Sequence, residues 1–583
     1  MLTVYENATE LVLTGEAEEL RLLVEETRFR PENYFYAVSY QRYVKSRGTE
    51  GWDGYIRPVF PINATSAKAL RGHREHILRL ADMLNLEVNR KHLLPRPFAE
   101  LMPDDVAPDL IAGPHQLDDN QRRCICDWLR EGIGFNKITV GGGKTATFAG
   151  AAALIKQHFP EARFLYLTPS ERLVRQSTHD MRGFLPQFEI GQCGGGVAEL
   201  EARDMVVCTV ALLHRRFRKL KTEGWFDTFM AVLYDEVHHT TSDTSQQVIM
   251  SVPAYFRLGA SDTAKQEDMA LKIKLRGLFG DMLNDIKASP LIASGRLAQP
   301  HIYIVDQPGW EGARAGIDFR ACVGSTAYLL LDQRWVKARY AGPVYELDKH
   351  GEVVKKIVHT SEQDAAGNWI VDVKPVTVPG LHTLEIDGVR HEVESRWCLL
   401  DRTYDKAVIQ FKPRNDLIIQ WASFFSQRGW PTVIVATRTT HVYILEALLK
   451  PVLQEKLDIL TGEDNSQRRD DVFQWLRDTP GAVLITPLVR EGVSINEIRA
   501  VIVADYVSDY EVARQIIGRA MRPKKRGSNQ AHVVWFWDKQ HPQLKRSCHN
   551  LFSRLRKMDG YVFHHACGAP ETVFPPDSGS IPA

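Results

Sequence analysis

The sequence has 583 residues, and its 73 lysines and arginines nearly balance its 72 aspartates and glutamates, so that its net charge is +1. Hydrophobic residues make up 44% and charged residues 25%, as in ordinary globular proteins, which excludes a wholly disordered chain or a collagen. No apolar run approaches the ~18 residues that span a bilayer, and the first residues are acidic where a signal peptide is basic. We therefore expect a cytoplasmic protein with no membrane partner.

The cysteines are scattered without a CxxC pair, which is typical of a reduced intracellular chain. The C-terminal segment does gather potential zinc ligands, but without the spacing of a zinc finger. They are Cys548, His549, His564, His565 and Cys567. Because unpaired Cys and His residues are more often simply buried or exposed, a metal is the less favoured interpretation of this group.

The expected elements divide the chain into five segments. Residues 1–100 mix short β-like runs with one helical pattern, which predicts a small α+β domain. Residues 117–305 and 401–540 alternate apolar strands with helices, the pattern of two parallel-sheet α/β domains. Residues 310–400 alternate short strands and turns, which predicts a β-rich insertion. Residues 541–583 are expected to form a helical extension that ends in a disordered Pro/Ser/Gly-rich tail.

The first segment with the pattern of a phosphate-binding site is glycine-rich, FNKITVGGGKTATFAGAAALI. A strand runs into Gly141, Gly142 and Gly143, and Lys144 and Thr145 then open a helix. In such a loop the backbone N–H groups surround a phosphate, the lysine reaches the terminal phosphates and the threonine hydroxyl binds Mg²⁺. Ile138 stands where the strict motif has its first glycine, so the alternative for the loop alone is an ordinary glycine-rich turn.

An apolar strand about 90 residues later ends in an acidic pair, in MAVLYDEVHH. Asp235 at the strand end is suited to holding Mg²⁺ through water. Glu236 is suited to orienting and deprotonating an attacking water, which hydrolysis requires and nucleotide binding does not. A solvated acidic pair is the alternative, but the order and distance from the glycine loop favour an ATP site with Mg²⁺.

A third feature lies in EVARQIIGRAMRPKKRG, where Gln515, Arg519 and Arg522 recur at helical spacing. Arginines delivered from a second domain stabilise the charge of a transferred phosphate and report its hydrolysis. The alternative is an exposed basic helix.

These features, in this order, resemble the superfamily 2 helicases and translocases over about residues 117–540. The resemblance implies two RecA-like domains, ATP and Mg²⁺ as cofactors, and DNA as the partner. Further segments of the sequence match the family's motifs. The match assigns adenine recognition to Gln121, DNA contacts to Thr168, Pro169, Arg172, Thr209, Thr437 and Thr486, and coupling of hydrolysis to movement to His238, Ser261, Thr263, Glu491 and Gly492.

Within the superfamily, two features resemble the UvsW-type phage recombination helicases and their XPB-like relatives. The first is GWDGYIRPVF in the N-terminal segment, which includes Arg57. The second is the run from KIKLRGLFG to GRLAQPHI. The resemblance implies that residues 1–100 bind DNA, with Arg57 as a contact, in a bacterial or phage-infected cell. The insertion matches nothing in the family, and we expect it to be a docking site if a protein partner exists.

Basic runs give further candidates for phosphate contacts. They are His214–Lys221, Arg522–Gly527 and the trio Arg71, Arg74 and Arg79. Each could equally be a solvated face. Trp52 and Tyr55 could stack on bases, although Trp52 is equally suited to anchoring the core of the small domain.

The sequence thus predicts an ATP-dependent DNA helicase or translocase that unwinds or remodels duplex or branched DNA in recombination, repair or replication. Its expected catalytic residues are Lys144, Asp235, Glu236, Gln515, Arg519 and Arg522. Two alternatives remain: a motor subunit of a restriction or defence system, and a nucleic-acid clamp or annealing protein that ATP merely switches.

Overall fold

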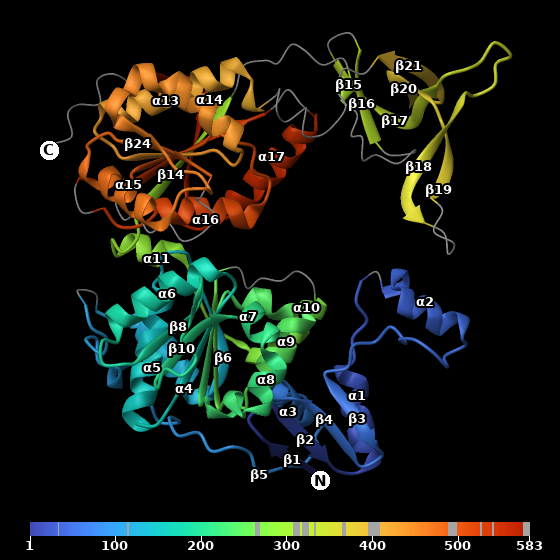
Figure 1. The fold of residues 1–583 in the computed structure, drawn as a ribbon. Coiled ribbons are helices and arrows are strands. Elements are labelled where there is room, and N and C mark those ends of the chain that lie inside the picture. Colours follow the sequence, from blue (N-terminus) through green and yellow to red (C-terminus); the bar gives the residue numbers. More distant parts are fainter. Residues whose placement is uncertain are drawn as a thin grey trace. The chain divides into compact units, whose positions relative to one another are not determined.

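A computed structural model divides the chain into two compact units, Met1–Leu297 and Ala298–Ala583 (Figure 1). The residues that it describes are 1–32, 34–113, 116–262, 269–306, 315–316, 326–331, 334–363, 369–394, 408–487, 498–524, 527–538 and 542–574. Within those ranges no helix combines the length and the apolar character needed to cross a bilayer.

The first unit begins with a five-stranded sheet in the order β3-β4-β2-β1-β5 (Figure 1). Its strands are β1 (Leu2–Glu6), β2 (Glu10–Thr14), β3 (Val59–Asn63), β4 (Ser66–Leu70) and β5 (Val88–His92). Its helices are α1 (Ala17–Thr27), α2 (Val38–Lys45) and α3 (Arg74–Met83). Apolar residues alternate along β1 and β2, so that Leu2, Val4, Leu11 and Leu13 are all buried on one face.

The rest of the first unit is an eight-stranded sheet in the order β13-β6-β12-β11-β7-β10-β8-β9, in which only the β8–β9 pair is antiparallel. Its strands are β6 (Ile133–Ile138), β7 (Phe164–Thr168), β8 (Ile190–Gly194), β9 (Val197–Ala198), β10 (Met205–Thr209), β11 (Ala231–Asp235), β12 (Phe256–Ser261) and β13 (Met282–Ile286). Its helices are α4 (Asp119–Glu131), α5 (Lys144–His158), α6 (Glu171–Phe184), α7 (Val210–Arg215), α8 (Phe217–Thr222), α9 (Asp243–Met250), α10 (Met269–Phe279) and α11 (Ala288–Ala293).

Strands β7, β10 and β11 are buried at every position, as expected for a parallel sheet covered on both faces. Because β6, β12 and β11 are neighbours and run parallel, their carboxyl ends meet at one edge. This edge carries the glycine loop after β6, Asp235 at the end of β11 and Ser261 at the end of β12. It is the place where open parallel sheets bind their ligands.

The second unit contains a seven-stranded parallel sheet in the order β23-β24-β22-β25-β26-β14-β27. Its strands are β14 (Gln299–Asp306), β22 (Thr432–Val435), β23 (Leu457–Ile459), β24 (Val483–Thr486), β25 (Ala500–Val503), β26 (Gln530–Trp537) and β27 (Val562–Ala566). Its helices are α13 (Lys412–Gln427), α14 (Thr439–Leu453), α15 (Ser466–Asp478), α16 (Tyr510–Ala520) and α17 (Pro542–Leu555). The predicted α/β class with two parallel sheets is confirmed.

The expected end of the first domain at residue 305 is corrected by strand β14. This strand pairs with β26 along its whole length, from Gln299 opposite Gln530 to Asp306 opposite Trp537, and so belongs to the second sheet. An apolar strand does not itself reveal which sheet it joins. The segment expected as a helical extension likewise contains β27, an edge strand of the same sheet, after α17. The tail expected to be disordered, at 575–583, lies outside the described residues.

Between β14 and α13 the described residues form antiparallel strands. They are β15 (Ala315–Gly316), β16 (Thr326–Leu331), β17 (Arg334–Tyr345), β18 (Lys355–Gln363), β19 (Trp369–Pro375), β20 (Thr377–Ile386) and β21 (Val389–Glu394). Five of them form a sheet in the order β15-β16-β17-β20-β21, and β18 pairs with β19 (Figure 1). Antiparallel pairing of neighbours is what the short strands and turns of this region predict.

Candidate functional site

The glycine loop joins β6 to the first turn of α5. Gly141 and Gly143 have φ of 78° and 84°, in the left-handed region that favours glycine. A Cβ atom on Gly143 would lie 2.1 Å from Nε2 of Gln121, so this position accepts only glycine without a rearrangement. A Cβ atom on Gly142 would meet the Ile138 side chain at 2.8 Å. The backbone N–H groups at the start of α5 can therefore come close to an anion.

Gln121 is buried against this loop. Its side-chain amide donates to the carbonyl oxygen of Gly143 at 3.4 Å, and its own backbone N–H donates to Asp118 at 2.8 Å at the start of α4. The reciprocal bond, from the Asp118 N–H to the Gln121 side chain, completes a capping box. Gln121 thus ties α4 to the glycine loop, while its recognition of adenine stays a prediction.

The acidic pair lies opposite the first lysine of α5. Lys144 donates to a carboxylate oxygen of Glu236, and its Nζ is 3.7 Å from Oδ1 of Asp235. Glu236 has φ of 58°, an uncommon conformation for a residue other than glycine, and its N–H donates to Asp235 Oδ1 at 3.0 Å. Such backbone outliers cluster at functional sites. Thr145 follows Lys144 and is half-buried in the first turn of α5.

Burial and mutual charge set the protonation of this group. Burial raises the pKa of Asp235 to about 6, with Lys144 opposing the shift. Burial acts in the same direction on Glu236, but Lys144 and His238 outweigh it, and the pKa of Glu236 is lowered. Burial lowers the pKa of Lys144, but the Glu236 and Asp235 carboxylates outweigh this effect and raise it. The lysine therefore stays charged beside two acids.

Asp262 is a third acid at this edge of the sheet, and the sequence reasoning missed it. It directly follows β12, is buried, and acts electrostatically on both Lys144 and Asp235. An acidic residue directly after an apolar strand is the same signal that identified Asp235. The three carboxylates outnumber the single ammonium group of Lys144, and the Thr145 hydroxyl follows Lys144 in the chain. Carboxylate and hydroxyl oxygens are ligands that suit Mg²⁺.

A chain of polar contacts leads from the acidic pair to the end of β12. Ser261 donates to Glu236 Oε2 at 3.1 Å, and its oxygen lies 2.7 Å from Nδ1 of His238. His238 Nδ1 is also 3.5 Å from Glu236 Oε2. Glu236 is thus held from both sides, by Lys144 and by the Ser261–His238 pair. This places two of the expected coupling residues, His238 and Ser261, in contact with the expected base.

Three other expected coupling residues, Thr263, Glu491 and Gly492, lie outside the described residues. Their roles stay predictions.

The expected arginine helix is α16 in the second unit. Its N-terminus is capped by Asp509, which accepts from the N–H groups of Glu511 and Val512. Gln515 and Arg519 lie half-buried on this helix, and Arg522 follows its end. Their action at the ATP site of the first unit stays a prediction.

The expected DNA contacts of the first unit lie at strand ends, where they organise the next helix. Thr168 is buried at the end of β7 and donates to the Ser170 carbonyl at 3.1 Å, while Pro169 beside it is exposed. Thr209 is buried at the end of β10 and accepts from the Leu212 N–H at 3.3 Å, which caps α7. Arg172 lies in α6, but its side chain is outside the described part.

In the second unit, Thr437 belongs to a buried cluster that sequence reasoning missed. Its hydroxyl donates to Asp505 at 2.6 Å, and its N–H donates to the same oxygen atom. Asp505 also pairs with His441, whose other ring nitrogen lies 3.1 Å from Asn415. Asp505 follows the apolar strand β25, the signal that would have found it. The other expected contact, Thr486, ends β24 and is buried.

The N-terminal signature forms a cluster of arginines and aromatic rings. Arg57 is paired with Asp53, and the guanidinium groups of Arg28 and Arg30 lie 4.4 Å and 4.3 Å from the centre of the Tyr55 ring. Trp52 donates to the Tyr55 carbonyl at 2.7 Å. Stacking of Tyr55 on a base requires that these guanidinium groups move. A DNA contact by Arg57 stays a prediction.

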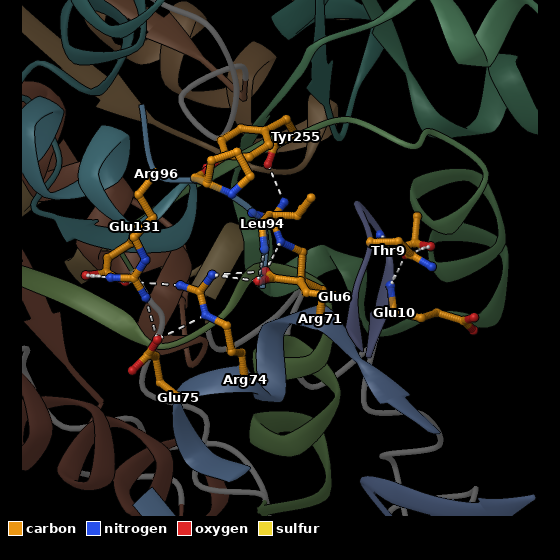
Figure 2. A network of polar contacts seen from close by, with 12 residues as sticks. Glu6, Thr9, Glu10, Arg71, Arg74, Glu75, Leu94, Arg96, Glu131 and Tyr255 are labelled. Atoms are coloured by element: carbon orange, nitrogen blue, oxygen red, sulfur yellow. Dashed lines mark hydrogen bonds and ion pairs between the residues drawn. The ribbon is translucent and has the colours of Figure 1, made fainter. Parts of the chain in front are cut away.

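Arg71 in η2 (Arg71–His73) and Arg74 at the start of α3 are not available to bind DNA. Arg71 and Arg74 are 0% and 2% exposed, and both donate to Glu6 of β1, at 2.8 Å and 2.9 Å (Figure 2). Arg71 also donates to the carbonyl oxygen of Tyr255 next to β12. The hypothesis of a DNA surface is therefore wrong for these two residues.

These arginines instead attach the N-terminal sheet to the eight-stranded sheet. Arg74 reaches Glu131 at the end of α4 at 3.4 Å, and the exposed Arg79 pairs with Asp281 at 2.7 Å. Gly72 packs so closely on α10 that a Cβ atom there would lie 1.9 Å from the Arg276 carbonyl oxygen. The contacts seen in Figure 2 are thus structural.

Comparisons with known proteins agree with the geometry. Residues 114–266 match the family model described as "Type III restriction enzyme, res subunit", and residues 415–524 match the "Helicase conserved C-terminal domain". Both matches support the placement in superfamily 2 that the sequence resemblance implied, and the two parallel-sheet domains have the expected RecA-like fold.

Individual relatives are more distant. The chain is 25% identical over 181 residues to the DNA 3'-5' translocase XPB2 of Sulfurisphaera tokodaii, a match over 31% of this chain and 38% of that protein. It is 23% identical over 201 residues to the putative helicase 22 of Sulfolobus islandicus filamentous virus, over 32% of this chain and 35% of that protein. A crystal structure of T4 UvsW aligns with 97% of this chain and 99% of its own at 14% identity, with a TM-score of 0.39.

Proposed function

We propose that the protein is an ATP-driven DNA translocase that remodels branched DNA such as forks and junctions. The observation that carries the ATPase part is the placement of Glu236 between Lys144 and the Ser261–His238 pair. A carboxylate whose only role was to balance the charge of Lys144 would not need the additional hydrogen bond from Ser261 at the end of β12. We assign Glu236 as the base for water and Ser261 with His238 as the route that reports its state.

ATP with Mg²⁺ supplies the phosphoanhydride bond whose hydrolysis drives movement. Lys144 and the N–H groups at the start of α5 would bind the phosphates, the Thr145 hydroxyl would bind Mg²⁺, and Asp235 would hold the metal through water. When Lys144 binds a phosphate oxygen, its contact with the Glu236 carboxylate would be released. Glu236 would then be available to accept a proton from the attacking water. Arg519 and Arg522, with Gln515, are assigned to stabilise transition-state charge from the second domain.

DNA as the partner is supported by a basic groove on the first unit. It is lined by the exposed Arg215 of α7, Arg218 and Lys219 of α8, and Arg216 between the two helices. The groove directly follows Thr209, a residue of an expected DNA-contacting motif, which caps α7. Clustered cations without base-reading geometry hold phosphate backbones and carry no sequence preference. This suits a motor that moves along DNA.

The test is steady-state ATP hydrolysis without nucleic acid and with single-stranded DNA, duplex DNA, a four-way junction or RNA, with Glu236→Gln as the blank. We expect the junction to stimulate hydrolysis most, and the blank to show no stimulated rate. Equal rates in all arms would overturn the DNA motor. Stimulation by RNA alone would overturn the choice of DNA.

A restriction-type motor is a second candidate, favoured by the match of residues 114–266 to a restriction-enzyme subunit. In that case a nuclease or methylase should copurify with the full chain. If the insertion is its docking site, the nuclease or methylase should not copurify with a variant that lacks residues 315–394. Junction-specific stimulation of the isolated chain would favour the remodelling motor instead.

A further inference from the structure

The edge of the second sheet brings together residues that are far apart in the sequence. Strand β27 lies beside β14 in parallel register, with His565 opposite Ile304 and Ala566 opposite Val305. Asp306 is the last residue of β14, and Cys567 directly follows β27. Both strands therefore deliver a polar residue to the same end of the sheet.

Three different donor groups meet there. The ligand atoms of Asp306, His565 and Cys567 all lie within 4.8 Å of one another. Nε2 of His565 is 3.2 Å from Oδ2 of Asp306. His565 and Cys567 are two residues apart, which directs their side chains to one face of an extended chain. Carboxylate oxygen, imidazole nitrogen and thiolate sulfur are the three ligand types that Zn²⁺ takes in proteins.

The surrounding structure holds these donors in place and leaves them accessible. After Cys567 the chain is fixed by the buried Trp421, whose indole N–H donates to the Gly568 carbonyl at 3.0 Å. The Trp537 ring meets the His565 ring edge-on at 6.5 Å. His565 and Cys567 are exposed and Asp306 is half-buried, so an ion and a water ligand can enter from solvent. Sites on rigid elements bind metals most reliably.

Cys567 also differs from the other cysteines that the structure describes. It is exposed, whereas these five are buried: Cys124, Cys126, Cys193, Cys208 and Cys548. Burial raises the pKa of the Cys548 thiol to about 12, which keeps it protonated and unsuited to a metal. Of the zinc ligands considered from the sequence, the structure thus selects His565 and Cys567, and it adds Asp306 from a distant strand.

We propose that Asp306, His565 and Cys567 bind one divalent transition-metal ion, with Zn²⁺ as the expected ion and water as the fourth ligand. The ion ties the edge strand β27 to β14 at the point where the chain leaves the sheet toward the insertion. Binding to the folded chain stabilises it by linkage. This site is independent of the proposed DNA motor, because none of its residues belongs to the ATP site.

The test uses the untagged full chain, stripped of metal and kept reduced with a phosphine, and titrates it with Co²⁺. We expect a thiolate-to-cobalt charge-transfer absorption that saturates at one equivalent and is bleached by Zn²⁺. Co²⁺ bound at the ATP site gives no such band, since that site offers oxygen ligands. Cys567→Ser should abolish the band, and His549→Asn, a change of an exposed histidine on α17, should keep it.

Thermal unfolding gives a second readout. Zn²⁺ should raise the Tm of the wild-type chain and of His549→Asn, and should leave the Tm of Asp306→Asn unchanged. A wild-type chain without the charge-transfer band, or a Cys567→Ser variant that retains it, would overturn the proposal. An equal Zn²⁺ shift in wild type and Asp306→Asn would overturn the assignment of Asp306.

Discussion

Two clusters of buried charge in the first unit differ in how exposed their side chains are. Glu6 accepts from Arg71 and Arg74, and its other oxygen accepts from the Leu94 N–H at 3.1 Å, with all three side chains 0–3% exposed. At the proposed ATP site the side chains of Lys144, Asp235 and Glu236 are 15%, 11% and 17% exposed.

The clusters also differ in charge. At the interface Arg71 and Arg74 share Glu6, and Arg74 also pairs with Glu75 and Glu131. At the proposed ATP site one lysine faces Asp235, Glu236 and the nearby Asp262. A closed cluster in which arginines and carboxylates alternate holds two sheets together. A partly open cluster with excess negative charge is suited to a cation and to a ligand that exchanges with a carboxylate. Buried charge alone therefore does not indicate a catalytic site, whereas partial exposure together with an excess of one charge does.

The largest expected effect comes from breaking the interface cluster. Glu6→Gln removes the carboxylate that Arg71 and Arg74 share and leaves Arg71 buried beside a neutral amide, whereas Arg74 keeps Glu75 and Glu131. The loss at Arg71 should lower the free energy of unfolding by about 3–5 kcal/mol. The measurement is urea unfolding of the first unit within the full chain. Glu10→Gln, which removes an exposed carboxylate 4.0 Å from Lys68, should change it by less than about 1 kcal/mol. Equal effects of the two variants would contradict a structural role for Glu6.

Breaking the ATP cluster should affect activity instead of stability. Lys144→Ala removes the charge that binds the terminal phosphates and should lower kcat by about 10²–10³-fold, as for a lost charge-stabilising donor. Steady-state ATP hydrolysis measures this loss. Lys450→Ala, at an exposed lysine of α14, is the control and should keep the wild-type rate. Similar losses in both variants would show that general unfolding is the cause.

Acid should weaken the interface through His73. Burial lowers the pKa of His73 to about 3 from its ordinary 6.5. Below pH 6.5 the unfolded chain therefore binds a proton that the folded chain does not, so stability is complete above this pH and falls as pH is lowered toward 3. The slope should be about 1.4 kcal/mol per pH unit for this group.

Urea unfolding measured between pH 7 and pH 5, at steps of roughly one pH unit, tests this slope. His73→Gln should flatten the profile relative to wild type. His549→Asn, at an exposed histidine, should leave it unchanged. A wild-type profile as flat as that of His73→Gln would contradict the buried neutral state.

The smallest effect is expected at the rim of the interface. Arg79 pairs with Asp281, but its side chain is 63% exposed. Arg79→Ala should therefore cost no more than about 1 kcal/mol, and high salt should reduce the difference further. The same urea assay measures it. A loss as large as that of Glu6→Gln would show that the pairing at Arg79 matters as much as that at Arg71 and Arg74.

The sequence predicted that Lys144, Asp235 and Glu236 lie together because the parts of this cluster are local. A glycine loop before Lys144 and an acidic pair after an apolar strand each fit within ten residues, and parallel strands bring such ends together. The role of Arg71 was missed because its partner, Glu6, lies 65 residues away in the sequence. No local motif around either residue indicates that the two form a pair. Basic residues on a helix look alike whether they face DNA or a carboxylate.

The sheet that a strand joins is equally invisible in the sequence. Strand β14 follows the first domain directly, yet its eight residues pair with β26, more than 200 residues later. The same non-local pairing brings Asp306 to His565 and Cys567, a group that ligand spacing alone did not suggest. Local motifs were thus predictable, and contacts between distant segments were not.

The most direct test of the central claim is a paired measurement on Glu236→Gln: MgATP binding at equilibrium, and single-turnover hydrolysis. If Glu236 is the base, the variant should bind MgATP at least as tightly as wild type, because Lys144 loses a competing carboxylate. It should also hydrolyse ATP about 10²–10⁴-fold more slowly. Hydrolysis at the wild-type rate would contradict the assignment of Glu236 as the base. Loss of MgATP binding would show that Glu236 only maintains the site.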